Sequence, residues 1–183
     1  MKKGITGALM LAVCVAVMAT GMAADMPAFE GPYIVTTCGQ SPGAVMVSMS
    51  AVQAGVTSGY NNELTVEGLN PDVNRTLIIT TGTSMKGMGA AGTEVDQEIE
   101  RCLKVAEAAK EAGMVVIGAH VEGMERRVDS TDEASIDAIL AVSDIILVIE
   151  ASDSDGFFTN YANAHQLPII TVENALAIGT ALQ

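Results

Sequence analysis

Positive charge is scarce in this chain. Its 183 residues include nine Lys and Arg against 22 Asp and Glu, which gives a formal net charge of −13 at pH 7. A surface of this sign repels phosphate backbones and anionic lipid unless its few cations are gathered in one place. The charge balance therefore argues against nucleic acid as a partner.

Cysteine and histidine are scarce as well, with three and two copies. Cys38 is expected at the end of a strand, and Cys102 about eight residues into a helix that starts at the same edge, hence ~12 Å down it. A disulfide needs Cα atoms within about 7 Å, so two unpaired thiols are predicted. His165 is not at ligand spacing from His120, and no metal site is predicted.

The amino terminus is typical of a secretory signal. Met1-Lys2-Lys3 precedes the apolar residues 4–24, and the first acid is Asp25. We predict export to the periplasm or the extracellular space, with cleavage after Ala23 or Ala24. Loss of the signal would leave seven cations and a net charge of −15. A stretch of about 20 apolar residues could also span a bilayer, so a membrane is a predicted partner only if this segment stays uncleaved.

The rest of the chain alternates apolar runs with helical signals. The runs are typical of strands in a parallel sheet that is covered on both faces, and they lie at 33–37, 77–81, 114–120, 145–150 and 168–172. Residues 64–66 are a candidate edge strand. Helix-start patterns such as Ser41-Pro42 lie between the runs. We predict a single α/β domain over residues 25–183, a three-layer sandwich with a mostly parallel five- or six-stranded sheet of flavodoxin or Rossmann type.

In such a sheet, every strand-to-helix loop leaves at one edge, which is where ligands bind. Three of the few cations, Lys86, Arg126 and Arg127, fall in these loops. The helix after the first strand also begins without an acid in its first turn, so its N–H groups are free for an anion. The predicted binding site for a small anionic molecule consists of Gln40, Ser41, Gly43, Lys86, Gly87, Gly89, Arg126 and Arg127.

Simpler interpretations of the same loops remain open. The two arginines could form surface ion pairs with Glu122, Glu125, Asp129 or Asp132. Residues 87–92 match the letters of a dinucleotide-binding fingerprint, but five residues separate the first glycine from its strand, and an acidic helix start follows. A small-residue loop packed over the sheet is the favoured interpretation, and no cofactor is predicted.

Catalysis is the alternative to binding at this edge. His120 ends a strand and Asp155 lies on a neighbouring loop, so either could serve as general base in a hydrolase or a glycosyl-type transferase. A structural, hydrogen-bonded His120 is the other interpretation. Neither Ser41 nor Ser84 has the surroundings of a nucleophile elbow, so non-catalytic binding ranks above catalysis. A structural or partner-binding domain of the cell envelope is the third hypothesis.

Five segments in order, at 39–41, 82–92, 104–110, 120–127 and 155–159, carry a resemblance that covers nearly all of the mature chain. They resemble a family of exported bacterial proteins grouped as domain of unknown function family 6305. The chain departs from the family pattern at Glu122 and Val128. The resemblance implies an exported α/β domain without an established activity, and it marks Gln40, Ser41, Lys86, Gly87, Gly89, Gly92, His120, Arg126, Arg127 and Asp155.

Overall fold

All five predicted apolar runs form strands of one parallel sheet in the computed structural model, which describes residues 25–183. The predicted signal segment, residues 1–24, lies outside the described residues. The strands are β1 (Tyr33–Cys38), β2 (Ser58–Tyr60), β3 (Thr76–Thr81), β4 (Val115–His120), β5 (Ile145–Ile149) and β6 (Ile169–Val172). Their order is β2-β1-β3-β4-β5-β6, and every neighbouring pair is parallel. The predicted flavodoxin-like class is confirmed.

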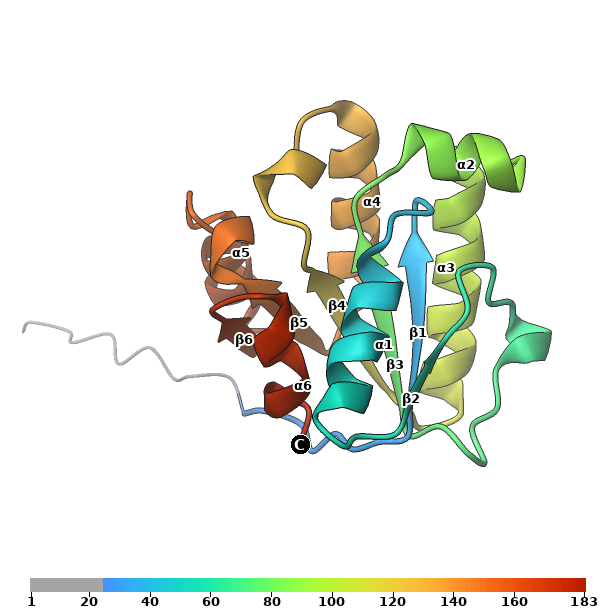
Figure 1. Ribbon diagram of the computed structural model, residues 1–183, viewed down its shortest axis with the longest axis vertical. Coiled ribbons are helices and arrows are strands. Elements are labelled where there is room, and N and C mark those ends of the chain that lie inside the picture. The colour runs from blue at the N-terminus through green and yellow to red at the C-terminus, as the bar shows by residue number, and fades with distance from the viewer. Residues whose placement is uncertain (1–24) are drawn as a thin grey trace, which may run out of the picture.

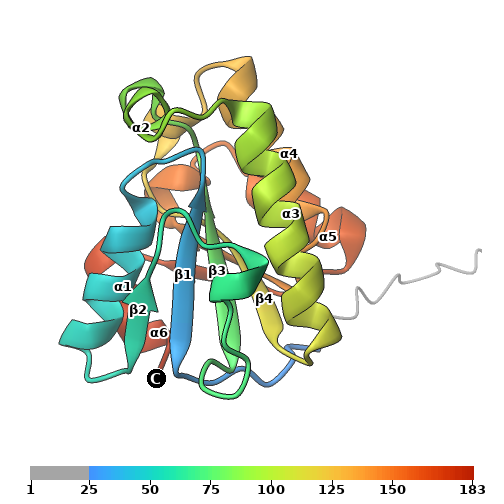
Figure 2. The ribbon, with the colours of Figure 1, turned by 90° about the vertical axis from the view of Figure 1, so that its right-hand side faces the viewer.

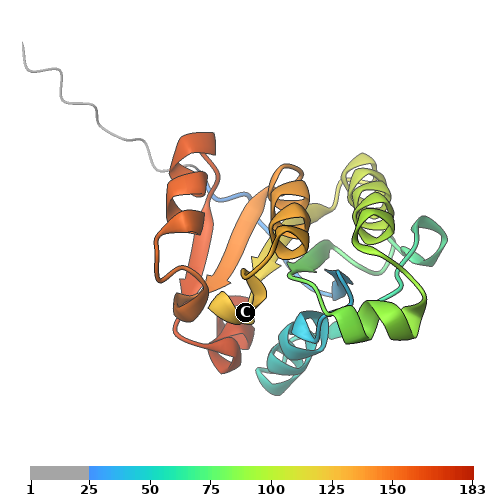
Figure 3. The same ribbon diagram turned by 90° about the horizontal axis from the view of Figure 1, so that it is seen from above.

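Helices cover both faces of the sheet, which explains why its central strands contain no Asp, Glu, Lys or Arg. One layer holds α1 (Gly43–Gln53) and α6 (Ile178–Ala181), and the other holds α3 (Val95–Glu111), α4 (Ser130–Leu140) and α5 (Phe157–His165) (Figure 1, Figure 3). Every residue of β3 and β5 is buried between these layers. Between residues 25 and 183, no helix is both long and apolar enough to cross a membrane.

The edge strand is not the predicted one. Residues 58–60 form β2, which pairs with β1 at the edge of the sheet beside α1 (Figure 2). Residues 64–66 do not pair. Leu64 is instead buried against α3 as part of an apolar cluster, and the short helix η1 (Val66–Gly68) follows it. Only Leu64 of this triplet is buried, whereas Thr65 and Val66 are exposed, so the apolar pattern reflected one core contact and not strand pairing.

The small-residue loop predicted around residues 87–92 is instead a further helix, α2 (Met85–Ala91), which ends at Gly92 in the left-handed conformation. Ser84 caps it by accepting a hydrogen bond from the Gly87 backbone N–H. This helix lies above the strand ends, and α3 starts beside it and runs down the sheet (Figure 1). The helix start predicted near Glu94 is confirmed, since Glu94 and Gln97 form a capping box.

Candidate functional site

The strand order reverses between β1 and β3, and ligands of open α/β sheets bind at this switch point. Here the two loops close on each other. Gln40 forms an isolated antiparallel bridge with Thr83, and the Ser84 N–H donates to the Gly39 carbonyl at 2.8 Å. A Cβ on Gly87 would lie 2.2 Å from the Gln40 carbonyl oxygen, so α2 can lie against this loop only with glycine there. The chain itself fills the crevice.

A carboxylate of the chain lies where the sequence predicted a bound anion. Glu122, in the loop after β4, accepts a hydrogen bond from the Gly43 N–H at 3.0 Å, at the start of α1. Its second oxygen accepts from Arg126 Nε at 3.1 Å, and Arg126 Nη1 donates to the Thr83 carbonyl at 2.7 Å. The Glu122 side chain is almost fully buried. It supplies the negative charge that the uncapped helix start favours, and the ion-pair interpretation of Arg126 is confirmed.

Arg127 forms its ion pair with a different partner from those predicted. Its two terminal nitrogens donate to the two oxygens of Asp155 at 2.9 and 3.0 Å, and its guanidinium lies 4.4 Å from the centroid of the Phe157 ring. The hydrogen bond from Arg127 lowers the pKa of Asp155. A carboxylate with a lowered pKa is a weaker proton acceptor, so this geometry does not favour Asp155 as a general base.

His120 is buried and uses both ring nitrogens within the protein. Nδ1 lies 2.9 Å from Thr81 Oγ1, and Nε2 lies 3.1 Å from the Gly123 carbonyl oxygen, which can only accept. Nε2 therefore carries the proton. The ring stacks on Phe158 at 5.2 Å, and burial lowers the pKa of His120 to about 4. The two hydrogen bonds and the lowered pKa favour the structural interpretation of His120, because neither ring nitrogen is free to take a proton from a substrate.

The other predicted residues divide into two groups. Ser41 is buried, with its hydroxyl 3.3 Å from that of Thr37, and the Gln40 amide donates to Glu98 at 3.1 Å. Lys86 and Gly89 are exposed on α2. The structure thus gathers Gln40, Gly43, Gly87 and Arg126 at the switch point, and sets Lys86 and Gly89 on an outer surface.

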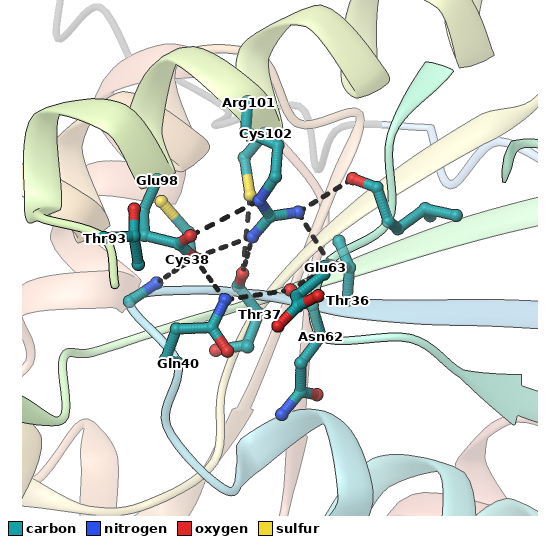
Figure 4. Close-up of polar contacts among 12 residues, drawn as sticks. Thr36, Thr37, Cys38, Gln40, Asn62, Glu63, Thr93, Glu98, Arg101 and Cys102 are labelled. Atoms are coloured by element: carbon teal, nitrogen blue, oxygen red, sulfur yellow. Dashed lines mark hydrogen bonds and ion pairs between the residues drawn. The ribbon is translucent and has the colours of Figure 1, made fainter. Parts of the chain in front are cut away.

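Two polar residues beneath the first loop escaped the sequence reasoning. Glu98 and Arg101, one turn apart on α3, form an ion pair of 2.7 Å (Figure 4). Glu98 also accepts the Gly39 N–H at 3.3 Å, and Arg101 donates to the carbonyls of Thr37 and Leu64. Glu98 and Arg101 each precede a residue of α3 that packs in the core, Ile99 and Cys102. This position beside the apolar side of the helix was the available sign that they are partly buried. Buried carboxylates thus hold the switch-point loops, since Asp132 similarly accepts the Thr83 N–H.

Cys38 and Cys102 are unpaired, as predicted, and both are buried, but the predicted separation between them is wrong. The thiol of Cys102 donates to the carbonyl of Thr37, the residue before Cys38, at 3.5 Å, so Cys102 lies beside the end of β1. The error arose from the start of α3. Figure 1 shows that α2 raises that start beyond the strand ends. The helix therefore reaches the level of the end of β1 further along its length, where Cys102 contacts Thr37.

An apolar groove of about 740 Å³ lies away from these loops, between α1, β2 and the short helix η4 (Ala175–Ala177). Its apolar lining comprises Met46, Met49, Val52, Tyr60, Ala175 and Leu176, and we call this surface the α1 face. Met49 is 65% exposed and Leu176 75% exposed. Residues 31–62 and 174–183 contain no charged side chain and no histidine, so every segment that forms this face is uncharged.

Replacing Glu122 tests whether the chain supplies its own anion. We expect Glu122→Ala to lower the free energy of unfolding by about 2 kcal/mol, because the Gly43 N–H and Arg126 lose a charged acceptor. Acetate or formate at tens of millimolar should restore part of the melting temperature in the variant and leave the wild type unchanged. The matched control is Glu125→Ala, which removes an exposed carboxylate three residues away. Equal losses in the two variants would contradict the assignment.

The model of a family described as "Domain of unknown function (DUF6305)" matches residues 30–183. No curated protein matches the chain. Among solved structures, a GDSL-like lipase from Bacteroides thetaiotaomicron VPI-5482 is similar at 12% identity and a TM-score of 0.37, over 76% of this chain and 66% of that one. A "putative acylhydrolase" from Bacteroides fragilis NCTC 9343 is similar at 10% identity and a TM-score of 0.35, over 80% and 71%. These likenesses are too weak to inform the activity.

Proposed function

Since the chain belongs to the DUF6305 family, whose description assigns no activity, we propose its function from its own surface. The protein is an assembly domain that associates with a second copy of itself through the α1 face. The observation that carries this proposal is an exposed, apolar and wholly uncharged face on a strongly acidic protein.

The composition of α1 supports an interface. This helix has no charged residue, and its buried side already supplies Ala44, Val47 and Ala51 to the core. Met49 and Val52 are apolar side chains on its outer side and are exposed. Surface helices are normally polar on the outer side, and a helix that is apolar all round is normally covered. Gathered exposed apolar side chains mark interaction surfaces on soluble proteins.

Charge favours a second copy as the occupant. Two molecules that each carry a net charge of −15 after loss of the signal repel one another over most of their surfaces. The α1 face is the neutral exception, and a two-fold arrangement would bring it against its own equivalent without placing acid against acid. The edge strand β2 lies in this face and presents a free outer edge to pair with a second β2.

An acidic residue on the α1 face should break the association. We expect Val52→Asp to weaken dimerisation of the full chain at least 100-fold, because each copy would bury a carboxylate in an apolar contact. Sedimentation velocity over 1–200 µM measures the effect. The control is Val128→Asp, which adds the same charge at an exposed valine on the loop before α4. The proposal fails if the wild type stays monomeric throughout, or if both variants dimerise like the wild type.

The other hypotheses require rearrangement of the site. A small anion at the start of α1 would have to displace Glu122, so stabilisation of the wild-type chain by acetate or formate would favour that function. An enzyme using His120 or Asp155 would have to release these side chains from Gly123 and Arg127. Export is part of our proposal, and the composition of residues 1–24 supports it.

A further inference from the structure

The pair of cysteines beneath the switch-point loop has no role in the proposed assembly. Cys38 ends β1, and Cys102 faces it from α3 (Figure 4). Both are fully buried in one apolar cluster, which includes Leu77 and Val105. The Cys102 thiol donates to the carbonyl of Thr37, the residue before Cys38, at 3.5 Å, so the two cysteines lie beside each other in this cluster. Such close thiols on two different elements are suitable for a covalent link.

We infer that Cys38 and Cys102 form a disulfide when the chain folds in an oxidising compartment. The oxidant is a disulfide, either of a small thiol such as oxidised glutathione or of a thiol oxidoreductase. One cysteine thiolate attacks this disulfide to give a mixed disulfide and one carrier thiol. The second thiolate then displaces the other carrier thiol and closes the Cys38–Cys102 bond. The two cysteines lose two electrons and two protons, and the carrier gains both.

Burial determines when the bond forms. In the folded protein neither thiol is exposed, so exchange with a carrier occurs before α3 has packed on β1. After packing, the same burial protects the bond from reductants. The reduced and the oxidised protein would therefore interconvert only through unfolding.

The bond would restrain a large part of the chain. Between the two cysteines lie α1, β2, β3 and α2, which include both loops of the switch point. Closing a long loop lowers the entropy of the unfolded chain more than closing a short one. We expect the oxidised protein to melt roughly 10 °C above the reduced protein.

Peptide mapping after oxidative refolding tests the inference. The full chain is reduced, unfolded, refolded with oxidised and reduced glutathione, alkylated under denaturing conditions and digested with trypsin. Cleavage after Arg101 and Lys104 releases the tripeptide Cys102-Leu103-Lys104. We expect this tripeptide to be joined to the peptide of residues 4–75, which contains Cys38, and to be released by reductant.

Two variants identify the bonded cysteine, because residues 4–75 also contain Cys14. The link should persist in Cys14→Ala and be absent in Cys38→Ala. Wild type that is refolded in dithiothreitol should melt the same roughly 10 °C below the oxidised wild type, whereas Cys102→Ala should melt at one temperature after either treatment. Alkylated, unlinked Cys102 in the refolded wild type, or a link that survives in Cys38→Ala, would overturn the inference. The wild-type and Cys14→Ala maps decide the matter even if the other variants fail to fold.

Discussion

Arg101→Ala should lower the free energy of unfolding by about 3–5 kcal/mol. The variant leaves the Glu98 carboxylate, whose side chain is only 4% exposed, without its cation. The carbonyls of Thr37 and Leu64 also lose their guanidinium donor. Removing one member of a buried ion pair is far more damaging than removing both, because the remaining charge stays desolvated. Urea denaturation at pH 7, followed by circular dichroism, gives the difference.

The same helix offers a matched control for this prediction. Lys104 and Glu100 form an ion pair of equal length, 2.7 Å, but their side chains are 65% and 67% exposed. Lys104→Ala should change the free energy of unfolding by no more than about 0.5 kcal/mol. A double variant, Glu98→Leu with Arg101→Leu, should recover much of the loss, since it removes the unpaired charge. Similar small losses in Arg101→Ala and Lys104→Ala would show that burial does not govern this pair.

The sheet was predictable because helices cover its central strands on both faces, which restricts the residues that these strands can contain. The sequences of β3 and β5 show this restriction. β5 is wholly aliphatic, and β3 combines three aliphatic residues with three threonines whose hydroxyls donate to backbone carbonyls. β2 has three residues, none of them buried. This strand is defined by its pairing with β1, which depends on the whole fold. Three exposed or half-buried residues carry no hydropathy pattern from which the strand could be predicted.

The candidate site was predictable in position but not in its internal contacts. The lack of an acid in the first turn of α1 indicated that an anion belongs there, and a carboxylate does lie at Gly43. Its source, Glu122, is 79 residues away in sequence. Which of several acids reaches that N–H depends on the conformation of the loop after β4, and one sequence does not determine it. Arg127 and Asp155 were likewise both predicted at this edge, although not as partners of each other.

The uncharged α1 face could have been predicted from the sequence, because the segments that form it lack charged residues. In a chain with 31 charged side chains, a stretch such as residues 31–62 with none needs an explanation. The buried strand β1 explains its first part. The outer side of α1 has no such explanation, because Met49 and Val52 are exposed. Counting charges by segment would therefore have favoured the third hypothesis, a partner-binding domain, over a site at the sheet edge.

Acidification should destabilise the protein through His120 by about 3 kcal/mol between pH 6.5 and pH 4. In the unfolded chain this histidine titrates near pH 6.5, whereas burial, assisted by the nearby charge of Arg127, lowers its pKa in the folded protein to about 4. Above pH 6.5 the imidazole is neutral in both states, and its contribution is complete. As the pH falls, the unfolded chain takes up a proton that the folded protein does not, so the equilibrium shifts toward unfolding until the folded pKa is reached.

A comparison with two variants separates His120 from the many carboxylates that titrate in the same range. His120→Gln can keep hydrogen bonds to Thr81 and Gly123 but cannot take up a proton, so it should be less stable than the wild type at pH 7 and draw level with it toward pH 4. His165→Gln replaces the exposed histidine at the end of α5 and should retain the wild-type slope. Urea unfolding at half-unit steps from pH 7 to pH 4 gives the three curves. Parallel curves for the wild type and His120→Gln would mean that His120 takes up its proton equally in the folded and the unfolded protein, and the assignment of a buried, neutral imidazole with a lowered pKa would then be wrong.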